Sequence, residues 1–251
     1  MAVTISESIN FSVALPIGCW HPLLPKMLSS IKFQNVELEI ALMDSSGDPR
    51  VAHTISESGL DFAYHHEGPD KGQADAIATG WAKTRGDVVF WLNADDQLMP
   101  EALNVAAAAF NADRDLAVFY GGSKFVDIDG IVTGHHDQVA DASDLIYRSN
   151  IVSQPSCFVR RNWVDLVGGL NRSLHYTMDW DLWVRLYAAG APFQRTPAML
   201  SQVYMGEGTK TSKINFGRLN EIARLVNRYA GPINALKSVM AVAQRPLLNA
   251  Y

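Results

Sequence analysis

The chain has few cysteines and little excess charge, and these absences exclude several classes of protein. Two cysteines are too few for a disulfide framework and suit a reducing compartment. The net charge of -5 provides no basic footprint for nucleic acid. No apolar run approaches the roughly 18 residues of a membrane-spanning helix, and the polar start, Met1 to Asn10, is unlike a signal peptide. We therefore expect a cytoplasmic protein without a nucleic-acid partner, and peripheral contact with the inner face of the cell membrane stays open.

The composition predicts an ordinary globular protein. Hydrophobic residues make up 48% of the 251 residues and charged residues 19%, which argues against disorder. This length is near the upper end of what one hydrophobic core supports, so one elaborated domain, or one domain with a helical tail, is expected.

The first 120 residues alternate between strand and helix patterns. Strands are predicted at 11–16, 36–43, 61–65, 87–92 and 116–120, and helices at 23–33, 50–58, 73–84 and 100–110. This alternation predicts an α/β fold with a mostly parallel, doubly wound sheet covered by helices on both faces. Ligands of such sheets bind at the carboxyl ends of the strands. Three acidic or polar loops follow predicted strands, at 44–48, 67–73 and 93–97.

The second half is less regular. A hairpin is predicted at 124–132, a polar loop at 135–144 and a strand at 151–160, and helices at 162–167, 178–189, 216–229 and 234–243. The last two helices carry apolar stripes. Packing on the domain, pairing of two copies and docking on a membrane surface all remain open for them.

Asp95 and Asp96 follow the clearest buried strand of the chain. Adjacent carboxylates repel each other, and a divalent cation removes that cost. Magnesium and manganese prefer oxygen ligands and often bridge carboxylates to substrate phosphates. The alternative is a solvated turn with a helix N-cap, because Pro100 follows closely.

Two other loops at strand ends carry candidate binding residues. Asp44 ends the second strong strand, where its carboxylate is able to accept hydrogen bonds from a base or a ribose; the alternative is an Asx-turn. The segment Lys71-Gly72-Gln73 precedes a helix, and a helix start with a nearby glycine suits a diphosphate. An ordinary loop with a solvated lysine is the alternative there.

The segment Asp179-Trp180-Asp181 opens a helix, and its two carboxylates point in different directions. One of them, beside tryptophan, is a candidate general base. Asp181 lies four residues before Arg185, which favours a structural ion pair for Asp181. The alternative role for both is complementing the helix dipole.

Together these segments resemble the family 2 glycosyltransferases of the GT-A fold, and most of all the non-processive bacterial enzymes that build polysaccharide or O-antigen chains. The matching blocks are Asp70 to Gly80, 86–87 with 91–96, Gln154-Pro155-Ser156 with 160–161 and Gly168, and 178–186. The resemblance covers roughly residues 11 to 212 and rests on the order and spacing of all blocks jointly.

The resemblance implies an inverting transfer from a UDP-, GDP- or dTDP-sugar to a hydroxyl of a glycan or lipid-linked acceptor. It makes Asp179 the base, and Asp96 with Asp95 the ligands of Mn2+ or Mg2+. Asp44 would contact the nucleotide base. The implied residues of the nucleotide-sugar site are Pro16, Asp44, Lys71, Asp75, Asn93, Asp95, Trp180 and Lys210.

The resemblance also implies a domain plan. One GT-A domain would span 1–212, with a nucleotide-sugar half at 1–120 and an acceptor half at 121–212, followed by a C-terminal helical extension at 213–251.

Three positions depart from the family pattern, and two rival functions follow from the sequence. The departures are Leu15 to Cys19, Ala78 and Gly206, the last at the place of a family histidine. They motivate a catalytically silent nucleotide- or carbohydrate-binding subunit as the alternative. A sugar nucleotidyltransferase ranks lower, because residues 15–26 contain one glycine and no arginine.

Overall fold

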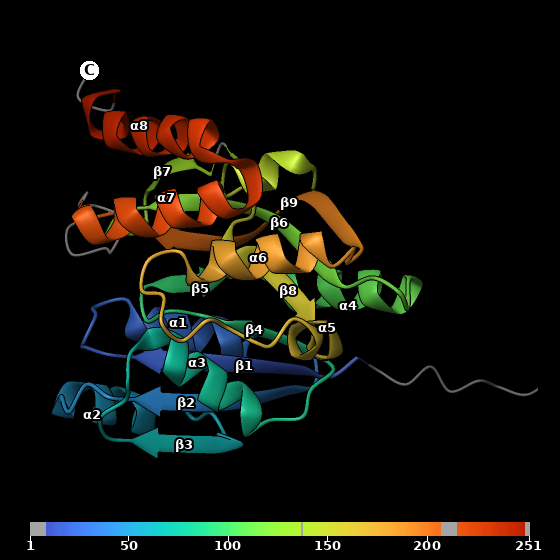
Figure 1. Cartoon of the computed structure of the whole chain (residues 1–251). Helices are drawn as coiled ribbons and strands as arrows, with labels where there is room; N and C mark the ends of the chain where they lie inside the picture. The colour runs from blue at the N-terminus through green and yellow to red at the C-terminus, as the bar shows by residue number, and fades with distance from the viewer. Residues whose placement is uncertain (1–8, 137, 207–214, 249–251) are drawn as a thin grey trace, which may run out of the picture.

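The computed structural model describes residues 9–136, 138–206 and 215–248 (Figure 1). No helix within these ranges combines the length and the hydropathy needed to cross a membrane.

The first half of the chain forms a parallel sheet, as predicted. Its strands are β1 (Phe11–Ile17), β2 (Leu38–Asp44), β3 (Tyr64–Glu67) and β4 (Val88–Trp91), and they lie in the order β3-β2-β1-β4. Every neighbouring pair among these four strands is parallel. Their carboxyl ends therefore share one edge of the sheet.

The second half continues the same sheet with mixed directions. Its strands are β5 (Asp96–Leu98), β6 (Val118–Val126), β7 (Val132–His135), β8 (Cys157–Arg160) and β9 (Phe193–Tyr204). The order from β4 is β8-β6-β9-β5, with β7 paired to β6. Strand β8 is antiparallel to both β4 and β6, whereas β9 runs parallel to β6.

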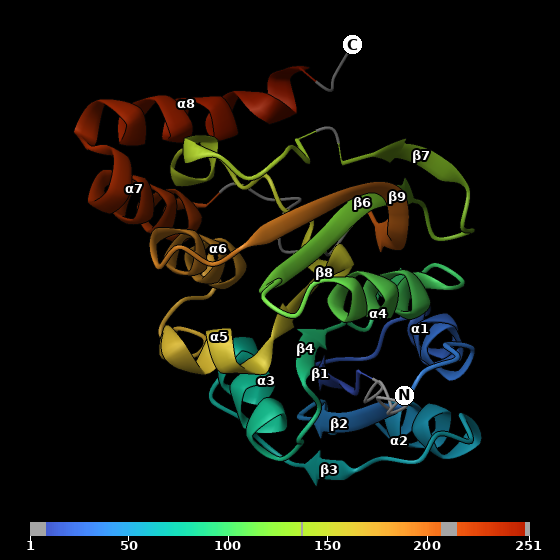
Figure 2. The same cartoon turned by 90° about the vertical axis from the view of Figure 1, so that its right-hand side faces the viewer.

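Helices cover both faces of the sheet (Figure 2). One face carries α1 (Leu24–Lys32), α2 (Pro49–Glu57) and α4 (Ala102–Ala112); the other carries α3 (Gln73–Ala82), α5 (Arg161–Leu166), α6 (Met178–Ala188) and α7 (Phe216–Ala230). Helix α8 (Pro232–Leu248) packs on α7, and two short 3-10 turns are η1 (Asp144–Tyr147) and η2 (Gln154–Ser156).

The central strands are almost entirely apolar, with Ser12 as the polar residue of β1, because both of their faces are buried. All seven residues of β1 are buried, with Val13 packed into the cluster under α1 and Ala14 into the cluster under α3. In β4 the same alternation sends Phe90 to the first cluster and Trp91 to the second. A continuous apolar run is the pattern that a two-sided parallel sheet requires.

Two glycines allow α3 to start and to pack where it does. Gly72, directly before the helix, has φ 109°, in the positive region that favours glycine. Gly80 faces the sheet, where an added Cβ would lie 3.1 Å from Ala14 Cβ and 3.2 Å from Ala41 Cβ. The helix therefore lies close on β1 and β2, and its N-terminus points to the carboxyl edge of the sheet.

Several predicted boundaries were wrong. The twelve-residue strand β9 was not predicted, since its burial follows no clear period of two. Residues 151–160 form η2 and the four-residue β8 instead of one strand, and β3 begins at Tyr64 instead of Asp61. Strand 116–120 and the first arm of the predicted hairpin form one strand, β6. The parallel sheet with helices on both faces and the two C-terminal helices are as expected.

Candidate functional site

The predicted polar loops meet at the carboxyl edge of the parallel strands. Ile17 at the end of β1 is level with Asp44 of β2, which is level with Glu67 of β3. The backbone N–H of Leu92 donates to the carbonyl of Ala14 (3.1 Å), so the chain leaves β4 beside β1. Asp44 and Asn93 therefore flank the end of the central strand.

Asn93 is the centre of a network of side-chain amides. Its Oδ1 accepts from Gln73 Nε2 (2.6 Å), and its Nδ2 donates to Asp96 Oδ2 (2.8 Å) and Gln154 Oε1 (3.3 Å). Gln154 Nε2 in turn donates to the carbonyl of Trp91 (2.8 Å). The network ties the start of α3, the end of β4 and η2 to one carboxylate.

That carboxylate is buried and lies in a strand instead of the polar loop predicted at 93–97. Asp96 begins β5, which pairs with β9, and only 4% of the residue is exposed. Its burial, followed by the negative charge of Asp95, raises the pKa of Asp96 well above its usual value. Two carboxylates are thus held together at an electrostatic cost that a cation would remove.

These donors fit a cation shared with a phosphate rather than a cage made by protein alone. Within the described ranges no group of three or more His, Cys, Asp or Glu side chains is arranged to hold a metal ion. Magnesium commonly takes one or two carboxylates and completes its shell with phosphate oxygens and water. Asp96 and the half-buried Asp95 supply that number of carboxylates.

Asp179 lies in the first turn of α6 and is held from a different segment. Asn150 Nδ2 donates to its Oδ2 (2.9 Å). Burial raises the pKa of Asp179, while hydrogen bonds from the Trp180 N–H and from Asn150, and the charge of Arg218, act in the opposite direction. The carboxylate is therefore more basic than an exposed one and remains hydrogen-bonded.

Asp181, two residues later, is engaged elsewhere. Arg185 Nε donates to Asp181 Oδ2 (2.8 Å), and Arg185 Nη1 donates to the carbonyl of Val167 (2.7 Å). The predicted structural ion pair is confirmed. Asp179 remains the candidate base of this segment.

Residues 150–154 connect the two carboxylate sites. Asn150 at one end contacts Asp179, and Gln154 at the other contacts Asn93. The rings of Trp91 at the end of β4 and Trp183 in α6 stack with centroids 6.0 Å apart and planes 17° apart. Both rings belong to the same apolar cluster as Ile151 and Val152, so β4 and α6 pack together beside the 150–154 segment.

Lys71 and Asp75 lie beside this centre at the start of α3. Lys71 is exposed, and Asp75 Oδ1 pairs with Arg172 Nη1 (2.6 Å). The neighbouring loop is closed by Asp70, whose Oδ1 accepts from the Gly72 N–H (2.7 Å). A partly exposed pair of this kind contributes roughly 0–1 kcal/mol. Contact of Lys71 and Asp75 with a nucleotide-sugar stays a prediction.

Asp44 makes the turn that was its alternative role. Its Oδ1 accepts from the N–H (2.8 Å) and the Oγ (2.6 Å) of Ser46, and 4% of the residue is exposed. It also lines a cavity of about 320 Å³ between α2 and β3, to which His65 and Glu67 contribute. Pro16 is buried in β1 beside it. Contact of Asp44 and Pro16 with a nucleotide stays a prediction.

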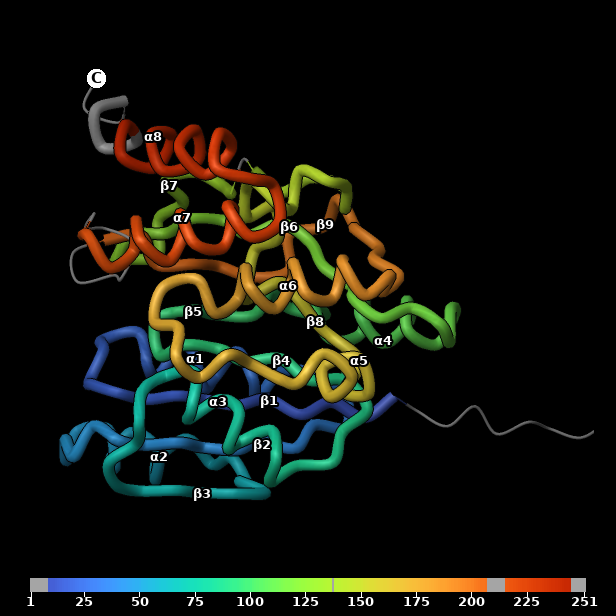
Figure 3. Tube along the Cα trace, viewed as in Figure 1, coloured from blue at the N-terminus to red at the C-terminus, as the bar shows by residue number. Residues whose placement is uncertain are grey.

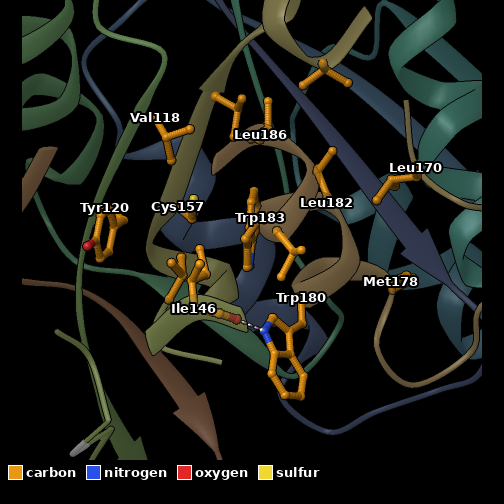
Figure 4. Close-up of a cluster of buried hydrophobic side chains, with 14 of the residues drawn as sticks. Val118, Tyr120, Ile146, Cys157, Leu170, Met178, Trp180, Leu182, Trp183 and Leu186 are labelled. Carbon is orange, nitrogen blue, oxygen red and sulfur yellow. Dashed lines mark hydrogen bonds between the residues drawn. The ribbon is translucent and has the colours of Figure 1, made fainter. Parts of the chain in front are cut away.

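Trp180 belongs to the apolar core under the site (Figure 4). Its indole Nε1 donates to the carbonyl of Ile146 (2.6 Å), and 5% of the residue is exposed. The side chain thus supports the start of α6 from below, and contact with a donor stays a prediction. Lys210 lies outside the described residues.

The sequence reasoning missed several residues that hold the site. Gln73 and Gln154 lie inside the segments that carry the family resemblance. The resemblance therefore pointed to their positions, but it gave neither residue a role in the site. No local pattern marks Asn150 or two residues of α7, Arg218 and Glu221. The hydrogen-bond partners of Asn150 and Glu221 lie 29 to 46 residues away in sequence, and Arg218 acts on Asp179 through its charge.

A sequence model described as "Glycosyl transferase family 2" matches residues 20–164. A chondroitin synthase of Escherichia coli is 26% identical over 234 residues, covering 90% of this chain and 33% of that protein. The O-antigen biosynthesis protein RfbC of Myxococcus xanthus is 31% identical over 140 residues, covering 56% of this chain and 11% of that protein. The chain therefore spans a third or less of these relatives.

Solved structures share the fold at low sequence identity. Residues 1–349 of S. aureus TarS, in complex with UDP-GlcNAc, superimpose with a TM-score of 0.68 at 16% identity, covering 94% of this chain and 72% of that one. The mannosyltransferase PcManGT of Pyrobaculum calidifontis, in complex with GDP-Man and Mn2+, gives 0.66 at 14% identity, covering 97% and 76%.

Proposed function

Because the chain belongs to glycosyl transferase family 2, we propose that it transfers a sugar from a nucleotide-diphosphate sugar to a hydroxyl of a glycan or lipid-linked acceptor. The observation that carries this proposal is the pairing of two separately held carboxylate sites. Asp95 and Asp96 lie at the carboxyl edge of the sheet, and Asp179 lies beyond the 150–154 segment that contacts both sites.

The donor side of the site is built by the acidic pair and the start of α3. Asp96 and Asp95 would hold Mn2+ or Mg2+ with the diphosphate, and the metal would supply positive charge as the diphosphate leaves. Lys71 and the N-terminus of α3 add positive charge there. The nucleotide and the sugar would be lined by Asp44, Pro16, Asp75 and Asn93. Two structures with this fold contain UDP-GlcNAc and GDP-Man, which supports a nucleotide-diphosphate sugar as the class of donor.

On the acceptor side Asp179 would act as general base. The acceptor hydroxyl attacks the anomeric carbon from the face opposite the diphosphate, and the anomeric configuration inverts. The new C–O bond forms as the bond to the diphosphate breaks, the diphosphate leaves with the electron pair, and the hydroxyl proton passes to Asp179. The raised pKa of Asp179 favours this role, since a base nearer the working pH accepts a proton more readily.

A thermal-shift screen tests the donor proposal. We expect the melting temperature to rise only with one of the UDP-, GDP- or dTDP-sugars and Mn2+ together. A ligand at about 100 times its Kd stabilises the folded state by about 2.7 kcal/mol, which is about 5 °C or more for a chain of this size. No shift with any donor would contradict the proposal. Binding without any transfer would favour the silent subunit instead.

Helix α8 carries the exposed side chains on which membrane contact or pairing of two copies would depend. Ile233 (71% exposed), Leu236 (62%) and Met240 (50%) form a stripe, while the stripe of α7 is buried against the domain. We propose peripheral contact of α8 with a membrane at the inner face of the cell. Wild-type protein should float with anionic vesicles and Leu236→Glu should not. Equal flotation would contradict membrane contact, and a dimer mass in light scattering that Leu236→Glu abolishes would favour pairing of two copies instead.

A further inference from the structure

One carboxylate of α7 collects the backbone donors that precede α6. Glu221 accepts from the N–H groups of His175 (2.9 Å), Tyr176 (2.8 Å) and Thr177 (2.9 Å), and from the Thr177 hydroxyl (3.1 Å). Successive N–H groups that converge in this way form an anion-binding nest. The carboxylate also lies at a helix N-terminus, where the helix dipole favours negative charge.

This contact replaces a local cap. Thr177, at the N-cap position of α6, makes no side-chain capping bond within its own helix. A helix start without a cap is destabilised, and its first turn frays more readily. Asp179 lies in that first turn, two residues after Thr177. Glu221, which contacts the residues directly before this turn, lies 42 positions after Asp179 in the chain.

Helix α7 is itself fixed next to α6 (Figure 3). Ile222, Leu225 and Val226 are buried in the same apolar cluster as Trp180 of α6. At its start, Asn215 caps α7 by accepting from the Arg218 N–H (2.9 Å) and donates to the Tyr176 hydroxyl (2.8 Å). Glu221 thus projects from a rigid element.

The same helix also places a positive charge near Asp179. Arg218 lies one turn before Glu221, and its charge lowers the pKa of Asp179. Among the described residues, the buried Cys157 thiol of β8 also interacts with Asp179, and its pKa is raised by burial and by the charge of Asp179. Helix α7 therefore acts on the first turn of α6 in two ways: the Glu221 carboxylate holds residues 175–177, and the charge of Arg218 acts on Asp179.

We propose that Glu221 is a positioning residue, which fixes residues 175–177 and through them Asp179, so that α7 is part of the catalytic unit. Its consequence for turnover rests on the proposed role of Asp179 as base. The positioning itself is a structural property and does not depend on which reaction the chain performs.

Hydrogen exchange tests the positioning without any substrate. In Glu221→Gln and Glu221→Ala the amides of His175, Tyr176 and Thr177 should exchange at least about tenfold faster than in wild type, while amides of β1 and β4 keep their rates. Arg224→Gln, in the next turn of α7, is the matched control and should change nothing at 175–177. Unchanged exchange in both Glu221 variants would overturn the proposal.

Kinetics test the consequence. Glu221→Gln should lower kcat about 10- to 100-fold with the donor KM within about twofold, and Glu221→Asp should recover part of it. An unchanged kcat in Glu221→Gln would overturn the positioning of Asp179. If wild type transfers no sugar, the proposed function fails while the exchange result still decides on Glu221.

Discussion

Asp179→Asn should lower kcat about 10³-fold while the affinity for donor and Mn2+ stays within about twofold. A general base contributes roughly 10²–10⁴-fold to a rate, and Asn keeps the size of the side chain while losing the ability to accept the proton. Because the replaced carboxylate is costly to bury, the melting temperature should not fall. Initial rates and calorimetric donor binding measure the two effects separately.

Asp181→Asn is the matched control for this prediction. It changes the same functional group two residues away, where the partner is Arg185. Transfer should persist, but stability should drop by about 1–3 kcal/mol, because a partly buried guanidinium exchanges an ionised acceptor for a neutral one. Transfer that survives Asp179→Asn, or that Asp181→Asn abolishes, would reverse our assignment of the two carboxylates.

The pH profile gives a second check on Asp179. The base must be deprotonated to work, so the rate should rise with pH through the pKa of Asp179. Burial raises that pKa above the usual value of an aspartate, and the acid limb should therefore lie at higher pH than for an exposed carboxylate. The limb should vanish from the residual activity of Asp179→Asn.

Asp96→Asn should abolish metal-dependent transfer, with a loss of about 10²-fold or more, without destabilising the metal-free protein. The carboxylate is buried beside Asp95, and repulsion between them opposes folding when no cation is present. Asn removes that repulsion and is able to keep the contact with Asn93. The metal-free variant should melt at the same temperature as wild type or higher.

Wild type and Asp96→Asn should differ in thermal stability once metal and donor are added. Wild type should gain thermal stability from Mn2+ with donor and lose the gain with EDTA, whereas Asp96→Asn should gain little in either case. Asp61→Asn, at an exposed carboxylate away from the strand ends, controls for the loss of one negative charge. Full transfer by Asp96→Asn, or by wild type in EDTA, would contradict a metal at the acidic pair.

Local patterns were sufficient for the parallel half of the fold. The apolar run of β1 and that of β4 identify strands buried on both faces, and glycine before α3 identifies the helix start. The family assignment was confirmed as well, because the chemistry-bearing segments keep their order and spacing. In β9 the same approach failed, because exposed, half-buried and buried residues follow one another in that strand without a regular period of two.

The sequence by itself determined the chemical inventory: the acidic pair after β4, the Lys-Gly-Gln loop and the candidate base Asp179. Only the tertiary structure decided how these groups are held. Asn93 takes partners 20 and 61 residues away, and Glu221 binds backbone N–H groups 44 to 46 residues away. Hydrogen bonds to backbone groups require no particular side chain at the receiving position, so they leave no pattern in the sequence. They exist only once the sheet and α7 have brought those segments together.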